Sequence, residues 1–255
     1  MKRIAFAHLK GGVGKTSAAI NIAYRAAQSG YRTLIIDLDA QGAAGYILRI
    51  DSGDAAKAKT VARAKKRVSD HIFATDFPRL DLMPGSFSLR KLPQLLAEEK
   101  EGKETVRSLI KRVGKGFDIV VVDAPAGLHL ESEAILLAVD LVLVPLIPSP
   151  LSIESFQPIR ALMRKNGKQK RLFGFFSMVD RRRRLHREMV ESAAETMPDV
   201  WRVEIPYASA VERMTTERLP LGAISRPGRA LHSYHVLWNR IAEELGVPAV
   251  AEEAE

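Results

Sequence analysis

Residues 10–16 read Lys-Gly-Gly-Val-Gly-Lys-Thr, between a short apolar run at 3–8 and a stretch at 17–23 whose apolar residues have helical spacing. These flanks predict a strand, a glycine-rich turn and a helix. Glycines allow the turn to curl so that successive N–H groups point inward, and the start of the helix adds its positive dipole end. The stretch therefore predicts a loop that binds phosphate groups.

The two ends of this loop carry lysines. Lys15 can reach the β- and γ-phosphates of a nucleotide, and the Thr16 hydroxyl can ligate Mg²⁺. The general phosphate-loop pattern asks for glycine at position 9, where this chain has Leu9, and a second lysine, Lys10, follows it. An incidental glycine-rich turn is the alternative, which both flanks disfavour. We expect nucleotide contacts from Gly11, Gly12, Val13, Gly14, Lys15, Thr16 and Ser17.

Length and composition narrow the class of protein. The 255 residues suffice for one large domain, and the absence of cysteine excludes disulfides, thiolate zinc sites and cysteine-ligated clusters. The start of the chain has no signal-peptide pattern and no uncharged run has transmembrane length, so we expect a soluble, cytoplasmic protein. The net charge of +9 favours polyanionic partners, nucleic acid first and an anionic membrane surface second.

Strands and helices are predicted to alternate along the chain. Strand-like apolar runs occupy 31–36, 80–85, 117–123, 141–145, 173–179 and 203–206. This pattern predicts an α/β fold with a doubly wound, mainly parallel sheet and helices on both faces. We expect a single domain over 1–246 and a disordered acidic tail over 247–255. Residues 51–69, rich in alanine and basic residues, are expected to form a solvated helix or a mobile insertion.

Carboxylates follow two of the predicted strands. Asp37 and Asp39 stand at alternate positions and point the same way, and Asp123 ends the most apolar strand pattern. At the carboxyl edge of a sheet, beside a phosphate loop, such groups suit the handling of Mg²⁺ and water. Capping of the following turns or helices is the alternative. Further along, Ser152 is expected to cap a helix that starts at 153.

Basic residues are dense between 160 and 187, where Asp180 is the only acid. Four successive arginines have no evident internal partners. A solvated helix face is the alternative, but such faces normally mix signs. We expect contacts with duplex DNA phosphates, without sequence readout. The candidate DNA-binding residues are Lys168, Lys170, Arg181, Arg182, Arg183, Arg184, Arg187 and Arg213.

The motifs together resemble the ParA/MinD family of P-loop ATPases, closest to small Soj-like partition ATPases. Residues 10–16 resemble its deviant Walker A signature, 37–42 its Asp-x-Asp-Pro-Gln-Gly segment with alanine in place of proline, and 123–127 its Walker B and switch segment. The resemblance implies that Lys10 reaches the phosphates of a partner subunit. It further implies that Asp39 orients the attacking water, that Thr16, Asp37, Asp39 and Asp123 support Mg²⁺, and that Pro148 lies near the base and sugar.

This resemblance implies a Mg²⁺-dependent ATP hydrolase. An ATP-bound homodimer would bind non-specific duplex DNA on the nucleoid, position DNA or another large cargo, and release it after hydrolysis stimulated by a ParB-like adaptor. One alternative is a MinD-like membrane ATPase, which the alanine- and glutamate-rich end of the chain disfavours. Another is a metabolic P-loop ligase or kinase, for which the sequence offers no separate substrate constellation.

Overall fold

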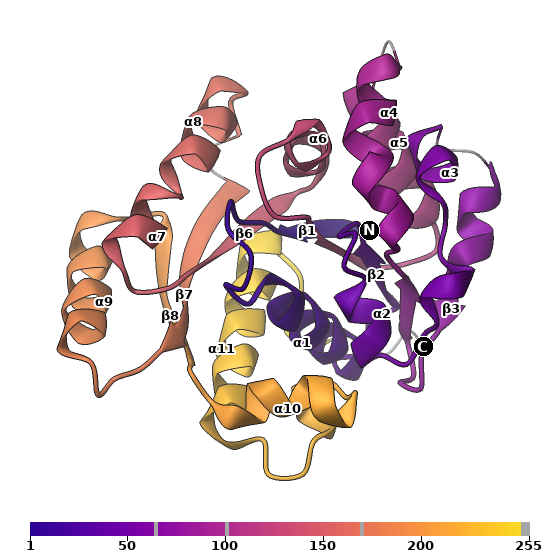
Figure 1. Cartoon of the computed structure of the whole chain (residues 1–255). Helices are drawn as coiled ribbons and strands as arrows, with labels where there is room; N and C mark the ends of the chain where they lie inside the picture. Colours follow the sequence, from indigo (N-terminus) through magenta and orange to yellow (C-terminus); the bar gives the residue numbers. More distant parts are fainter. Residues whose placement is uncertain (64–65, 100–101, 169–170, 251–255) are drawn as a thin grey trace.

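The first strand leads directly into the glycine-rich loop, and the sheet extends to both sides of it (Figure 1). A computed structural model describes residues 1–63, 66–99, 102–168 and 171–250. The strands are β1 (Lys2–Phe6), β2 (Thr33–Asp37), β3 (Phe73–Ala74), β4 (Leu80–Met83), β5 (Ile119–Asp123), β6 (Leu141–Leu146), β7 (Leu172–Val179) and β8 (Val200–Pro206).

These strands form one eight-stranded sheet in the order β3-β4-β2-β5-β1-β6-β7-β8. Each neighbouring pair is parallel except β3–β4, which is antiparallel and was not predicted from sequence. The chain moves outward from β1 to β2 on one side and from β5 to β6 on the other. The connections therefore diverge next to β1 and β5, which is where a doubly wound sheet opens a ligand crevice at its carboxyl edge. The predicted fold class is confirmed.

Helices cover both faces of the sheet (Figure 1). The helices are α1 (Lys15–Gln28), α2 (Ala43–Ile47), α3 (Ala58–Ala62), α4 (Leu92–Glu98), α5 (Gly102–Val113), α6 (Leu130–Ala138), α7 (Pro150–Glu154), α8 (Gln157–Lys165), α9 (Arg184–Thr196), α10 (Ser209–Glu217) and α11 (Gly228–Leu245). One face packs on α1, α2, α10 and α11, and the other on α3–α6, α8 and α9. Among the described residues, no helix has both the length and the apolar character needed to span a membrane.

The strands divide their side chains between the two cores. In β5, Ile119 and Val121 face the α1 side, whereas Val120 and Val122 face the α5 side. This is the alternation that an extended backbone imposes, and because both faces are covered, the strand reads as an unbroken apolar run. The same division holds in β1, where Phe6 packs edge-on against Phe175 of β7 at a ring-centroid distance of 6.2 Å.

Residues 51–69 differ from the expected solvated helix or mobile insertion. Their described part contains a 3-10 turn, η1 (Ser52–Asp54), the helix α3, and the start of a second 3-10 turn, η2 (Lys66–His71). Small apolar side chains from this segment are buried in the core on the α5 side, whereas Lys57, Lys59 and Arg63 between them are exposed. The spacing of the alanines indicates a buried face, but the charged residues between them made the segment look solvated. The buried members are Ala55, Ala56, Ala58, Val61, Ala62 and Val68.

Two further expectations need correction. The helix after β6 begins at Pro150 with Ser149 as its N-cap, so Ser152 lies inside α7, where its hydroxyl oxygen accepts the Ile147 N–H at 3.0 Å. In the predicted tail, residues 247–250 are held in place: the Tyr31 hydroxyl donates to the Pro248 carbonyl at 2.7 Å and the Trp238 indole to the Ala249 carbonyl at 2.9 Å. Residues 251–255 lie outside the described part of the chain.

Phe175 and Phe87 offer a matched test of this core. Phe175 is fully buried, whereas Phe87, in the 3-10 turn η3 (Phe87–Lys91), is 67% exposed. We expect Phe175→Ala to lower the free energy of unfolding by about 3–5 kcal/mol, because it removes a buried ring and leaves a cavity. Phe87→Ala should cost less than about 1 kcal/mol. Denaturant titration measures both, and equal losses would contradict this packing.

Candidate functional site

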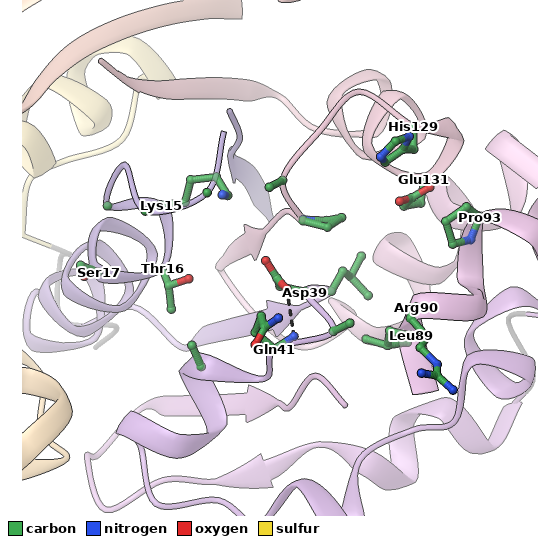
Figure 2. A pocket seen from close by; sticks show the side chains of 18 of the residues that line it. Lys15, Thr16, Ser17, Asp39, Gln41, Leu89, Arg90, Pro93, His129 and Glu131 are labelled. Carbon is green, nitrogen blue, oxygen red and sulfur yellow. Dashed lines mark hydrogen bonds between the residues drawn. The ribbon is translucent and has the colours of Figure 1, made fainter. Parts of the chain in front are cut away.

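The glycine-rich loop forms one wall of a cavity at the carboxyl edge of the sheet (Figure 2). Gly12 and Gly14 have φ of 73° and 94°, a region that favours glycine, and Gly14 is the N-cap of α1. A Cβ on Gly14 would also lie 2.8 Å from the Ser177 hydroxyl oxygen of β7. The N–H groups at the start of α1 lack acceptors within the helix. The loop can therefore offer these donors to an anion.

The cavity has a volume of about 680 Å³. From the predicted nucleotide-binding loop, it is lined by Gly11, Gly12, Gly14, Lys15, Thr16 and Ser17. Val13 and Pro148 are both buried, and neither lines the cavity. Lys10 is exposed, and its ammonium lies 3.5 Å from the Leu151 carbonyl oxygen of α7 rather than among the lining residues. Within this chain, Lys15 and not Lys10 faces the cavity.

Thr16, which lines the cavity, contacts Asp123, which is fully buried and is not among the lining residues. The register of β5 with β1 and β2 aligns Asp123 with both Phe6 and Asp37. From the first turn of α1, the Thr16 hydroxyl donates to Asp123 Oδ2 at 2.5 Å. The other oxygen, Oδ1, is buried and has no hydrogen-bond partner among the described residues. An unpartnered buried carboxylate oxygen is costly unless something else binds it.

Asp37 is fully buried, and both of its carboxylate oxygens accept backbone N–H groups. Its Oδ1 accepts the Asp39 N–H at 3.0 Å and its Oδ2 the Ala44 N–H at 3.1 Å. A Cβ on Gly85 would lie 2.9 Å from Asp37 Oδ1 and 2.4 Å from the Asp39 carbonyl oxygen. Asp37 therefore fixes the loop that carries Asp39, and its direct role in metal binding stays a prediction.

Asp39 lines the cavity, opposite the glycine-rich loop (Figure 2). Its Oδ1 accepts the Gln41 N–H at 2.9 Å, which closes a turn that points the carboxylate toward the cavity. Ala40, which stands where the family has proline, also lines this wall. The sequence prediction thus brought Thr16, Asp39 and Asp123 to one edge, with Asp37 behind them.

Burial dominates the electrostatics of the two strand-end aspartates. Desolvation raises the pKa of Asp123 to about 7, and Asp39 adds to the rise, whereas Thr16 and Lys15 oppose it. Desolvation and the neighbouring Asp123 raise the pKa of Asp37 well above its usual range. Two negative charges in this position repel each other, so the site favours a cation or a proton.

The donor set fits a nucleotide with Mg²⁺. Oxygen ligands suit this ion, which takes few of them from protein and the rest from phosphates and water. The described residues contain no group of three or more His, Asp or Glu side chains that could hold a metal by themselves. The unpartnered Asp123 Oδ1 and the Thr16 hydroxyl supply two oxygens beside a loop rich in N–H donors. The residues present therefore fit the ion as part of a nucleotide complex.

Sequence reasoning missed the far wall of the cavity. It comes from η3, α4, the segment after β5 and the start of α6, and includes Leu89, Arg90, Pro93, His129 and Glu131 (Figure 2). Glu131 is 4% exposed, its Oε2 has no partner among the described residues, and burial raises its pKa. No motif marks these positions. Only the Pro125–Ala126 pair, within the switch segment identified from sequence, could have indicated this wall.

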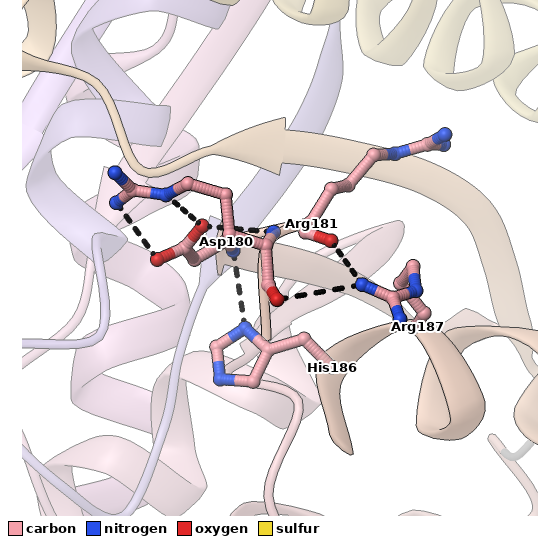
Figure 3. Close-up of polar contacts among 5 residues, drawn as sticks. Asp180, Arg181, His186 and Arg187 are labelled. Carbon is pink, nitrogen blue, oxygen red and sulfur yellow. Dashed lines mark hydrogen bonds and ion pairs between the residues drawn. The ribbon is translucent and has the colours of Figure 1, made fainter. Parts of the chain in front are cut away.

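Three of the four successive arginines form ion pairs with carboxylates, and Figure 3 shows the loop around Asp180. Arg181 pairs with Glu204 at 2.7 Å, Arg182 with Asp180 at 2.9 Å and Arg184 with Glu188 at 2.6 Å. The expectation of unpaired arginines is therefore wrong for these three. Glu204 lies on the neighbouring strand β8, whereas Asp180 is two residues before Arg182 and Glu188 is one turn after Arg184 on α9. Arg183 forms no side-chain ion pair with the residues that the structure describes.

Three other candidate DNA-binding residues also have hydrogen-bond partners. Arg187 donates to the carbonyls of Arg181 and Arg182 (Figure 3), and Arg213 binds Glu217 and two loop carbonyls. The Lys168 ammonium contacts the Leu137 carbonyl, and Lys170 lies outside the described residues. Arg181–Arg184 nevertheless remain solvent-exposed at the carboxyl edge of β7, two strands from β1.

The Asp123 carboxyl predicts a pH dependence of stability. Its folded pKa of about 7 lies above the ordinary value of 3.8, so the folded protein binds a proton that the unfolded chain releases. Stability of the nucleotide-free protein should therefore fall as pH rises from about 4 to 7. We expect Asp123→Asn to raise the free energy of unfolding at pH 8 by on the order of 1–3 kcal/mol and to flatten this slope. Denaturant titrations at several pH values measure both.

Asp118 supplies the matched control. Arg32 lowers the pKa of this carboxyl, so Asp118→Asn should reduce stability at pH 8 rather than raise it. If both substitutions change stability in the same direction, burial of Asp123 is not the cause of the slope.

Comparison with known proteins agrees with this geometry. A family model described as an AAA domain matches residues 1–172. The chromosome-partitioning ATPase Soj of Treponema pallidum is 25% identical over 251 residues, which cover 96% of this chain and 98% of that protein. The sporulation initiation inhibitor protein Soj of Bacillus subtilis is 26% identical over 212 residues, which cover 80% of this chain and 84% of that protein.

Solved structures of other proteins have a fold similar to that of this chain. A complex of Cyanothece McdA with ATP matches with a TM-score of 0.81 at 18% identity and covers 99% of both chains. The cell division ATPase MinD of Pyrococcus furiosus matches with a TM-score of 0.76 at 22% identity and covers 96% of this chain and 98% of its own. Because the family model matches most of the chain and the two Soj proteins align over most of its length, the chain belongs to the ParA/MinD family of P-loop ATPases.

Proposed function

We propose that this protein is a ParA-type ATPase that couples the hydrolysis of ATP to reversible binding of non-specific duplex DNA, and so positions DNA or another large cargo. The observation that carries the proposal is the meeting of Thr16 and Asp123 beneath the glycine-rich loop, with Asp123 Oδ1 left unpartnered among the described residues. That arrangement offers two oxygens for a cation next to the N–H donors of the loop that lines the cavity.

The loop, Lys15, Thr16 and the three aspartates have distinct roles in this proposal. The N–H groups of the loop and the Lys15 ammonium bind the phosphate chain and balance its charge. Thr16 and Asp123 would hold Mg²⁺, which supplies further charge neutralisation on the phosphates when bound. Asp39 accepts a hydrogen bond from the attacking water and aligns it, while Asp37 keeps the backbone of Asp39 fixed.

Lys10 supports the proposed ATP-dependent homodimer. Its side chain lies outside the cavity of its own chain, near α7. The resemblance to the family implies that this lysine completes the site of a partner subunit. The nucleotide would then join two chains, because each active site would need a lysine from the other.

The arginine-rich segment 181–187 is the proposed DNA surface. It lies at the same edge of the sheet as the cavity, and a two-fold dimer would present it twice. Paired phosphate contacts steepen the dependence of affinity on salt and strengthen binding. The dimer would in this way bind the nucleoid while ATP is present, and a ParB-like adaptor that stimulates hydrolysis would release it.

Asp39 provides the first test. We expect Asp39→Ala to lower the kcat for ATP hydrolysis by about 10²–10⁴-fold, because the water loses its acceptor, and to leave ATP affinity close to that of the wild type. Phosphate release and equilibrium nucleotide binding measure the two quantities. An equal loss of affinity would show that Asp39 shapes the nucleotide site rather than the chemical step.

Arg183 and Lys111 form a matched pair for the DNA surface. Both are exposed, but Lys111 lies on α5, whose end precedes the amino end of β5. We expect wild-type protein to bind duplex DNA only with ATP and Mg²⁺. Arg183→Ala should weaken that binding and reduce the slope of log affinity against log salt by about 0.9 for each DNA phosphate that is no longer neutralised, while Lys111→Ala changes neither.

DNA binding is best measured by fluorescence anisotropy with no nucleotide, with ADP, and with ATP and Mg²⁺. Asp39→Ala, run in parallel, should keep the ATP-dependent complex for longer. Absence of DNA binding in every nucleotide state would overturn the DNA role, and binding to anionic vesicles under the same conditions would then favour the MinD-like function.

A further inference from the structure

A chain of hydrogen bonds links the start of the glycine-rich loop to α7 through the buried side chain of His8. The Lys10 backbone N–H donates to His8 Nδ1 at 2.9 Å, and His8 Nε2 lies 3.0 Å from the Ser155 hydroxyl. That hydroxyl donates to the Ser152 carbonyl at 2.6 Å. His8 is only 1% exposed. Water therefore does not compete for either ring nitrogen.

Only one arrangement of protons satisfies this chain. A carbonyl oxygen can only accept, so the single hydroxyl proton of Ser155 goes to Ser152. Ser155 must then accept the proton on His8 Nε2, which leaves Nδ1 with a lone pair for the Lys10 N–H. Burial and the positive charge of Lys15 lower the pKa of His8 to about 4, so the ring stays neutral at physiological pH. The neutral Nε2–H tautomer thus fits every partner.

The segments joined at His8 are those that the proposed mechanism uses. Its carbonyl oxygen accepts the N–H of Gly127, in the segment that follows Asp123, at 3.2 Å. Ser152 also accepts the Ile147 N–H, which fixes the loop after β6. The Lys10 ammonium contacts the Leu151 carbonyl of the same short helix. The backbone of Lys10 is therefore linked to the end of α7 through His8 and Ser155, and its side chain contacts the helix directly.

The two contacts of Lys10 differ in strength. The backbone bond to His8 at 2.9 Å has the ordinary length of a good hydrogen bond, whereas the ammonium contact at 3.5 Å is at the long limit. An exposed ammonium can leave such a contact easily, while the shorter, part-buried backbone bond to the buried His8 ring is harder to break. The geometry thus holds the backbone of Lys10 in place and leaves its ammonium group free to move.

We propose that His8 is a positioning residue that fixes the backbone of Lys10 on α7 so that its side chain can move from Leu151 to the nucleotide of a partner subunit. This inference rests on the proposed function, in which Lys10 acts across an ATP-bound homodimer. His8 itself touches no nucleotide in this scheme. It acts through Lys10, and Ser155 acts through His8.

Two substitutions of His8 distinguish its hydrogen bond to Lys10 from its hydrogen bond to Ser155. In His8→Asn the side-chain oxygen takes the place of Nδ1 and can accept the Lys10 N–H, whereas in His8→Gln the terminal amide takes the place of Nε2 and reaches only Ser155. We expect His8→Gln to lower kcat and the ATP-dependent dimer affinity roughly tenfold, the effect of removing one buried hydrogen bond. His8→Asn should lower them by no more than about twofold.

A double-mutant cycle with Lys10→Ala shows whether His8 acts through the lysine. If it does, His8→Gln should have almost no further effect on kcat or dimerisation once the Lys10 side chain is removed. Dimerisation is followed by sedimentation velocity in ATP and Mg²⁺, hydrolysis by phosphate release, and folding by thermal unfolding of each variant. Equal effects of Asn and Gln, or additive effects with Lys10→Ala, would overturn the proposal and leave His8 a packing residue.

The wild-type protein distinguishes this failure from failure of the proposed function. A wild type that neither hydrolyses ATP nor dimerises with it would contradict the proposed function, and the role of His8 with it. If the wild type does both and the two His8 variants are indistinguishable, only the positioning role of His8 would be overturned.

Discussion

The lateral register of β1, β2 and β5 is the constraint on which the site depends. Phe6, Asp37 and Asp123 lie side by side across these three strands, so the segments that follow them start at one height along the same edge. A shift of one residue would turn the aspartate side chains to the opposite face. The apolar layers on both faces hold this register. The packing of the core and the 2.5 Å contact between Thr16 and Asp123 therefore depend on the same alignment.

This alignment places two carboxylates in a desolvated position, which opposes folding at neutral pH. Asp37 offsets part of the cost through two backbone N–H groups, whereas Asp123 keeps one oxygen without a partner among the described residues. A ligand that supplies positive charge at this oxygen binds the folded state and not the unfolded chain, so it stabilises the fold by mass action. The site where buried negative charge most destabilises the fold is thus also the site where a positively charged ligand can stabilise it most.

The sequence was most informative where one pattern carried both local structure and chemistry. The glycine-rich loop and the strand-end Asp123 were predicted because strand, turn and polar residue occur together. The prediction failed for residues 51–69, whose alanines pack in the core although charges stand between them, and for Arg181, whose partner Glu204 is distant in sequence. His8 gave no signal because its partners, Lys10 and Ser155, are joined only by folding. Pairings between distant segments were what sequence patterns could not supply.

The ion pairs of the arginine-rich segment change what contact with a polyanion would mean. An arginine that is already bound to Asp180, Glu204 or Glu188 exchanges one anion for another, and the abandoned carboxylate then attracts a cation from solution. Fewer ions are released overall than the number of arginines suggests, because part of the charge is neutralised beforehand. The surface would therefore bind a polyanion with moderate affinity and exchange it rapidly. Of the four successive arginines, Arg183 alone would contact the polyanion without first breaking an ion pair among the described residues.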